Sequence, residues 1–224
     1  FIENSGSGDG NLGAAIHGEN SQIFMDGSKI NENRNEGTGS RGAGIYLVGG
    51  SSPSVIINSE IRGNEAKRGA AIYLDQNDLK LERMIISGNE TADKGSIYAR
   101  KSALSIVNST IVGNTYLEDD DVSAGAIYLD YASPAGDEPG GILSVVNSIV
   151  WGNKSPQINT GWGINYINLA YSNLEPGILD ELVINDFSGY DDFSLYDDTL
   201  EDGDPEFWSS LTWEDPLPST GGDF

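Results

Sequence analysis

The feature that most limits the fold of this chain is a two-part repeat. The first part is a block of small residues followed by Ile-Tyr, or by Ile-His in the first copy, and five copies can be aligned. Their isoleucines, separated by 29, 27, 25 and 30 residues, are Ile16, Ile45, Ile72, Ile97 and Ile127. Because the spacing varies while the blocks do not, the blocks are expected to form the framework and the spacers to form loops.

The second part of the repeat is a β-rich block that ends in asparagine. The five asparagines are Asn33, Asn64, Asn89, Asn114 and Asn153, and Tyr171-Ser172-Asn173-Leu174 is a weaker sixth copy of the block. Short alternating apolar runs such as Leu104-Ser105-Ile106-Val107 precede these blocks and indicate strands of four or five residues. One repeat therefore holds about three short strands.

A unit of this size cannot bury both faces by itself, but stacked units can. Each strand then pairs with its equivalent one coil away at about 4.8 Å, and the five isoleucines point into one shared core. Residues 1–174 show no sustained 3.6-residue period that would indicate helices. We therefore expect an all-β parallel β-helix, or solenoid, of about six coils over residues 1–174.

The recurring asparagines are expected to form an internal ladder. Asparagine tolerates the left-handed conformation at a corner, and stacked amides can hydrogen-bond from coil to coil. The alternative is glycosylation, because Asn89, Asn108 and Asn153 each begin an Asn-x-Ser/Thr pattern. Since Asn89 and Asn153 both belong to the proposed ladder, the ladder is favoured.

The Gly-Ala-Ile-Tyr blocks, alternating with Asn-Ser-x-Ile-x-Gly-Asn blocks over residues 1–174, resemble the pectin-lyase-like right-handed parallel β-helix superfamily. More narrowly, the pattern is similar to the repeats of polymorphic outer-membrane proteins and related surface proteins. This resemblance implies right-handed winding and an extracellular or cell-surface location. It implies little about activity, because one fold carries many functions.

The composition changes after residue 174. Residues 175–224 combine clustered acidic residues with aromatic ones, and we expect them to form an irregular cap over the last coil.

The first residues, Phe1-Ile2-Glu3-Asn4, align with the end of a second block, as if the chain began partway through a coil. Gly221-Gly222-Asp223-Phe224 resembles a pattern after which such surface proteins continue. A piece of a longer protein is therefore expected, which a native mass equal to 23.9 kDa would contradict.

Charge excludes some partners and suggests one ligand. With 35 acidic and 12 basic residues the net charge is −23, which repels nucleic acid and anionic lipid. No apolar run is long enough for insertion into a membrane. The acidic run Glu118, Asp119, Asp120 and Asp121 could bind calcium, although an unliganded acidic loop is favoured because the run shows no defined ligand spacing. We expect no other cofactor.

Evidence for catalysis is weak. The charges in the expected strands, Glu60, Arg62, Lys80, Glu82 and Arg83, are scattered as on a solvated face, and the single histidine, His17, occupies a tyrosine position of the repeat. Exposed Tyr46, Tyr73, Tyr98 and Tyr128 could form a stripe that stacks on sugar rings. The favoured interpretation is that they pack at the corner and simply stabilise the stack.

The function expected from the sequence is a non-enzymatic structural or adhesive segment of a secreted or cell-surface protein. Its partners would be copies of itself, since strand edges readily propagate, or other surface proteins. The competing hypothesis is a polysaccharide-active protein, either a lyase or glycosidase-like enzyme or a carbohydrate-binding relative. Acidic side chains converging in a groove would distinguish the two.

Overall fold

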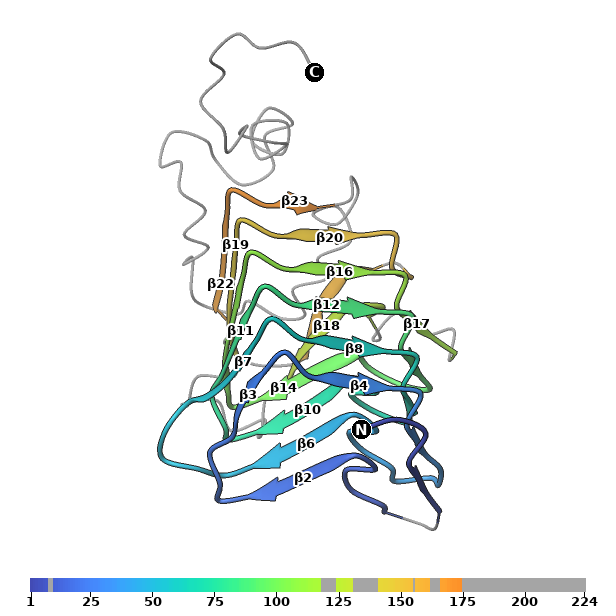
Figure 1. Cartoon of the computed structure of the whole chain (residues 1–224). Helices are drawn as coiled ribbons and strands as arrows, with labels where there is room; N and C mark the ends of the chain where they lie inside the picture. The colour runs from blue at the N-terminus through green and yellow to red at the C-terminus, as the bar shows by residue number, and fades with distance from the viewer. Residues whose placement is uncertain (8–9, 118–123, 131–140, 155, 162–165, 175–224) are drawn as a thin grey trace, which may run out of the picture.

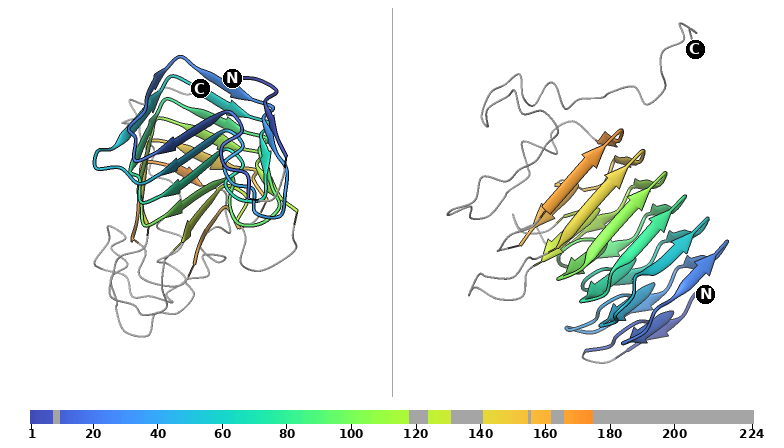
Figure 2. Two further views of the ribbon diagram at one scale, coloured as in Figure 1. Left: turned by 90° about the horizontal axis from the view of Figure 1, so that it is seen from below. Right: turned by 90° about the vertical axis from the view of Figure 1, so that its left-hand side faces the viewer.

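The chain forms a parallel β-solenoid. A computed structural model describes residues 1–7, 10–117, 124–130, 141–154, 156–161 and 166–174. Their regular elements are all strands, stacked one coil above another along one axis (Figure 1), around a common interior (Figure 2). No helix capable of crossing a membrane occurs in these residues. The predicted all-β solenoid is confirmed, whereas the predicted cap at 175–224 lies outside the described residues.

Four parallel sheets run along the solenoid, and we number them in the order in which one coil passes through them. Sheet 1 contains β2 (Ile16–Glu19), β6 (Ile45–Val48), β10 (Ile72–Asp75), β14 (Ile97–Arg100), β18 (Ile127–Asp130) and β21 (Ile158–Thr160). Sheet 2 contains β3 (Phe24–Asp26), β7 (Ser54–Ile57), β11 (Leu79–Glu82), β15 (Ala103–Val107), β19 (Ile142–Val146) and β22 (Tyr166–Ala170).

The second half of each coil supplies the other two sheets. Sheet 3 contains β4 (Lys29–Asn31), β8 (Glu60–Arg62), β12 (Ile85–Ser87), β16 (Thr110–Val112), β20 (Ile149–Trp151) and β23 (Asn173–Leu174). Sheet 4 contains β1 (Ser5–Gly6), β5 (Arg34–Asn35), β9 (Glu65–Ala66), β13 (Glu90–Thr91) and β17 (Thr115–Tyr116). The sequence predicts about three strands per coil. The strands of sheet 4 were not predicted, because a two-residue strand is too short to show alternation.

Equivalent residues of the repeat lie in register. Ile72 pairs with Ile45 on one side and with Ile97 on the other, and the neighbouring tyrosines pair in the same way. The spacing between blocks varies, yet this pairing is continuous, so the extra residues lie in the turns. Insertions between the blocks therefore leave the stacking of the sheets unchanged.

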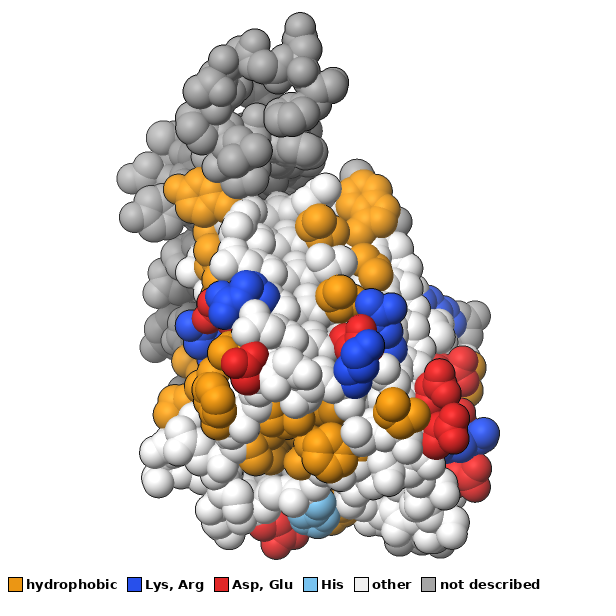
Figure 3. Space-filling model, in the orientation of Figure 1, with side chains coloured by type: hydrophobic (Ala, Val, Ile, Leu, Met, Phe, Trp, Pro, Cys, Tyr) orange, Lys and Arg blue, Asp and Glu red, His pale blue; other side chains and the backbone are white. Residues whose placement is uncertain are grey.

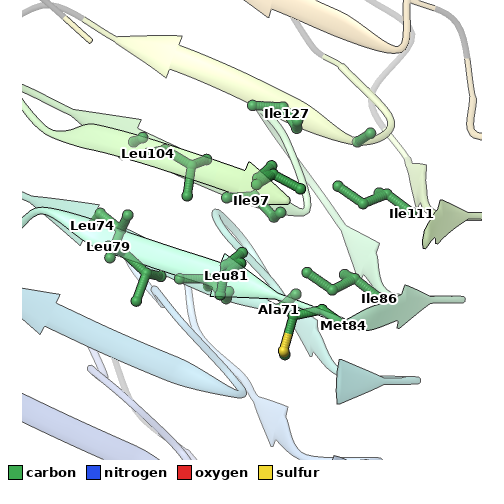
Figure 4. Close-up of a cluster of buried hydrophobic side chains, with 14 of the residues drawn as sticks. Ala71, Leu74, Leu79, Leu81, Met84, Ile86, Ile97, Leu104, Ile111 and Ile127 are labelled. Carbon is green, nitrogen blue, oxygen red and sulfur yellow. The ribbon is translucent and has the colours of Figure 1, made fainter. Parts of the chain in front are cut away.

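The interior is a single cluster of aliphatic side chains from sheets 1, 2 and 3. Ile45, Ile72, Ile97 and Ile127 have no exposed surface, and Ile16, on the edge strand β2, is partly buried against the same core. Figure 4 shows Ile97 and Ile127 in this cluster, together with Leu104 from sheet 2 and Ile111 from sheet 3. Each coil alone has too few of these residues to exclude water, so burial depends on the coils above and below it.

Candidate functional site

The asparagine row lies inside the corner between sheets 3 and 4. At each step the backbone N–H and the side-chain Nδ2 of one asparagine donate to Oδ1 of the next. The Nδ2···Oδ1 distance is 2.8 Å from Asn64 to Asn89 and 2.8 Å from Asn89 to Asn114. The row begins at Asn4, whose Nδ2 donates to Asn33 Oδ1, and ends where Asn153 Nδ2 donates to Gln157 Oε1.

From Asn33 to Asn153 these amides are buried, and each makes several hydrogen bonds. Asn89 Nδ2, for example, also donates to the backbone oxygen of Ile61 at 3.1 Å. Asn89 is fully buried and Asn153 nearly so, which leaves neither side chain room for a glycan in the folded chain. Asn108 is different, because its side chain is exposed at the corner between sheets 2 and 3. The row therefore acts as an internal polar support for the stack.

A second polar row, of serines, lies at the corner between sheets 2 and 3 and was not predicted. The backbone N–H of Ser109 donates to Ser148 Oγ at 3.0 Å, and that of Ser148 donates to Ser172 Oγ at 3.2 Å. Met84 replaces the serine in one coil, and its N–H still donates to Ser109 Oγ. The repeated Asn-Ser dipeptides at 58–59, 108–109 and 147–148 were the available signal.

The tyrosines of sheet 1 form a continuous stack outside the aliphatic core. The ring centroids of Tyr46 and Tyr73 are 5.2 Å apart, those of Tyr73 and Tyr98 4.7 Å, and those of Tyr98 and Tyr128 5.9 Å. Their exposed fractions are only 2–5%. The favoured interpretation, packing that stabilises the stack, agrees with this burial, whereas the exposure needed for sugar stacking is absent: the rings cover one another and offer no free face to a sugar.

The turns between sheets 4 and 1 cover the tyrosine stack. Leu12 and Ala124 pack against it, the Arg41 guanidinium lies 5.3 Å from the Tyr73 ring centroid, and Lys94 Nζ lies 4.7 Å from that of Tyr128. A cation over an aromatic face is attracted by the electrons of the ring. These turns differ in length and sequence from coil to coil, whereas the tyrosines recur in each block. Loops that vary between repeats therefore cover tyrosines that do not.

One hydrogen bond to a carboxylate and one ion pair border the tyrosine stack. The Tyr98 hydroxyl donates to Asp130 Oδ2, and Arg100 Nη1 donates to Asp75 Oδ2 at 3.1 Å. Asp75 is nearly buried and its Oδ1 has no protein donor, so the pair with Arg100 must offset the cost of burying its charge. Arg100 lies between Asp75 and Asp130 in the register of sheet 1. This alternation of charges stabilises the outer edge of the stack.

The buried tyrosines predict a loss of stability at alkaline pH. Burial raises the pKa of Tyr46 and Tyr73 above the usual value, and for Tyr98 the burial effect is strengthened by the neighbouring Asp130. A raised pKa in the folded chain means that the unfolded chain loses its protons first, above pH 10. Each such tyrosine should then remove about 1.4 kcal/mol of stability per pH unit.

The measurement is urea unfolding between pH 8 and pH 12, read together with tyrosinate absorbance. Tyr73→Phe should reduce the slope of the unfolding free energy against pH by the contribution of one tyrosine, about 1.4 kcal/mol per pH unit. Titration of all the tyrosines near pH 10 in the folded chain, with stability independent of pH, would contradict this prediction.

The remaining predicted charges lie apart from the tyrosine stack and pair locally. On sheet 3, Lys29 Nζ lies 2.9 Å from Glu60 Oε1, and this hydrogen bond, with one from Asn31, lowers the pKa of Glu60. On sheet 2, Lys80 Nζ lies 2.8 Å from Glu82, which also pairs with Arg83. These ion pairs are partly exposed to solvent, so each contributes little to stability.

His17 has the role of a variant tyrosine. It pairs in register with Tyr46, its ring centroid lies 5.0 Å from the Tyr46 centroid, and its Nε2 lies 3.0 Å from Glu19 Oε1. The His17 ring therefore packs edge-on against Tyr46 at the first-coil end of the tyrosine stack.

The predicted metal ligands Glu118, Asp119, Asp120 and Asp121 lie outside the described residues. In the part of the chain that the structure describes, no three His, Cys, Asp or Glu side chains gather where they could hold a metal ion. Calcium binding by the acidic loop therefore stays a prediction.

An apolar surface on sheet 3 was also missed by the sequence reasoning. Ile85, Val112, Ile149 and Trp151 project outward from three neighbouring strands, β12, β16 and β20, and we call them the apolar patch. Figure 3 shows hydrophobic side chains above the charged ones on this face. The signal was present in Ile149-Val150-Trp151, where the residues on both sides of an inward valine are also apolar.

Comparisons with protein-family models, curated proteins and solved structures gave no match. The class of the protein is therefore defined by its fold and its bonded rows. It is a parallel β-solenoid whose interior is supported by an asparagine row and whose sheet 1 is supported by a tyrosine stack.

Proposed function

We propose that the chain is a stiff, non-catalytic segment of a secreted or cell-surface protein and serves as a spacer or as an adhesive assembly surface. The observation that best supports this is the unbroken bonding between coils. Parallel strand pairs join the described coils, and the asparagine row, which is buried from Asn33 onward, runs alongside them from Asn4 to Gln157. A rod bonded in this way resists bending and extension.

The repeat pattern supports a relationship with pectin-lyase-like right-handed β-helices, and in particular with the repeats of polymorphic outer-membrane proteins. The proposed partners are copies of the chain itself or other surface proteins. The strands β2, β3 and β4 each form the outermost member of a sheet at one end of the described solenoid, and β21, β22 and β23 do so at the other. An uncovered edge strand can pair with a strand from another molecule.

Mechanical unfolding tests the proposed role of a stiff segment. We expect a chain that is pulled by its two ends to resist extension and then to lengthen in steps of one coil. A coil of about 25 residues should release about 90 Å of extended chain. Smooth lengthening at the force needed for an unstructured linker would contradict the proposal.

An assay for breakdown of polysaccharides tests the non-catalytic part of the proposal. The chain is incubated with acidic polysaccharides, with and without calcium, and reducing sugars and unsaturated products are measured. We expect no product above the level of heat-denatured chain. Product formation above that level would instead support the competing hypothesis of a polysaccharide-active enzyme.

A further inference from the structure

The apolar patch is an exposed, contiguous surface without a role in the fold. Ile85 and Ile149 lie in one outward column, on either side of Thr110, and Val112 and Trp151 are neighbours in the next column. Ile85, Ile149 and Trp151 are 41–43% exposed, and Tyr171, at the adjoining corner, is 59% exposed. Exposed apolar side chains gathered on one flat face are typical of a surface that binds a partner.

We propose that residues 187–213 of the same chain bind to the apolar patch of sheet 3. This segment lies outside the described part of the chain. Its sequence contains seven aromatic and eight acidic residues and no lysine or arginine. Its aromatic side chains match the apolar patch, and its carboxylates match the cations near the patch.

The connection to the solenoid places this segment within easy reach. β23 pairs directly with β20, the strand that carries Ile149 and Trp151, so the chain leaves sheet 3 at Leu174 beside the patch. The 12 residues from 175 to 186 span up to about 40 Å when extended. The patch extends over only two strand spacings, about 10 Å, from β20 to β12.

Charge favours the same occupant. Residues 175–224 hold 15 acidic residues and no basic ones, whereas residues 1–174 hold 20 acidic and 12 basic. The outward faces and shared corner of sheets 2 and 3 carry four cations, Lys29, Arg62, Lys80 and Arg83, against three anions, Asp26, Glu60 and Glu82. These seven charges leave the surface with a small positive balance on a strongly acidic chain, so it does not repel the acidic segment.

The size of the patch argues against a second copy of the chain as the occupant. A stable protein–protein interface uses about 20–30 residues on each side. The apolar patch has four residues, with Tyr171 beside it, and ion pairs occupy the rest of the face. This is the size of a site for a short segment, which is tethered and does not need high affinity to remain bound.

Photo-crosslinking from a single cysteine tests this proposal on the full chain. The sequence has no cysteine, so Val112→Cys can be labelled with a photoactivatable maleimide at one site. The matched control is Ser105→Cys, which lies on the outward face of β15 in the same coil but on sheet 2. An Asp-specific protease then releases the tail peptides, because residues 187–213 lack sites for trypsin.

The expected result is a crosslink within one chain from position 112 to residues 187–213, and little from position 105. Adding Ile149→Asp to the Val112→Cys chain should lower the yield about tenfold, since burial of one aliphatic side chain is worth at least that factor in an equilibrium constant. Ser144→Asp, which adds the same charge on sheet 2, should leave the yield unchanged. Circular dichroism checks that both variants keep their β structure.

Two outcomes would overturn the proposal. A crosslinked dimer from position 112 would show that a second copy occupies the patch. Absence of any crosslink to residues 187–213, in a chain that is labelled and folded, would show that the segment does not bind there. Neither result would affect the proposed role as a stiff segment, because mechanical unfolding measures that property separately.

Discussion

Asn89→Ala is expected to destabilise the fold by about 2–6 kcal/mol, because two buried donors lose their acceptor and each costs about 1–3 kcal/mol when unpaired. These donors are the backbone N–H and the Nδ2 of Asn64, which both bond to Asn89 Oδ1. The substitution also removes one of the two donors to Asn114 Oδ1, the Nδ2 of Asn89, and leaves the backbone N–H in place. Urea unfolding followed by circular dichroism measures the loss as a lower midpoint.

The matched control is Asn168→Ala, which removes an exposed amide from the outward face of β22. We expect it to change the stability by less than about 0.5 kcal/mol, as for most surface substitutions. Equal midpoints for Asn89→Ala and Asn168→Ala would mean that the asparagine row does not stabilise the stack.

Gly125→Ala is expected to cost about 3 kcal/mol or more, because the site has no space for a methyl group. A Cβ at position 125 would lie 2.2 Å from the backbone oxygen of Lys154 and 2.5 Å from its nitrogen. Both atoms belong to the backbone of the next coil and cannot rotate away as a side chain can. The coils must therefore move apart, which weakens the hydrogen bond from Gly125 N to Pro156 O.

Gly113→Asn provides the comparison for Gly125→Ala. Gly113 has φ +64°, no atom lies within 4 Å of the place that a Cβ would take there, and asparagine adopts this left-handed conformation readily. We expect its loss of stability, measured by the same urea unfolding, to be well under half that of Gly125→Ala. Similar losses for both would show that backbone conformation at the corners, and not close contact between neighbouring coils, limits the stability.

Much of the fold follows from the repeat, and one of its sheets does not. The Ile-Tyr blocks predict both the register of sheet 1 and the inward direction of Ile72 and its equivalents. The position of Asn89 between Asn64 and Asn114 follows in the same way. Sheet 4 and the serine row were missed because their signals are only one or two residues long, too short to define a period.

The tyrosine stack shows where prediction from the sequence ends. Alternation along β10 correctly places Tyr73 on the opposite face to Ile72 and Leu74, so the sequence predicts that it points away from the core. Its burial depends on Arg41 and on the other turns that lie over it. These turns differ in length and composition from coil to coil, and no local pattern encodes their course.

By itself, the sequence determined which residues are equivalent and therefore which residues stack, since similar short blocks occupy the equivalent position in every coil. Only the tertiary structure decided which outward faces are covered: the tyrosines of sheet 1 lie beneath turns, whereas Ile149 and Trp151 on sheet 3 are exposed. The physical reason is that register is set by hydrogen bonds between neighbouring repeats, while burial depends on contacts with loops that have no repeat.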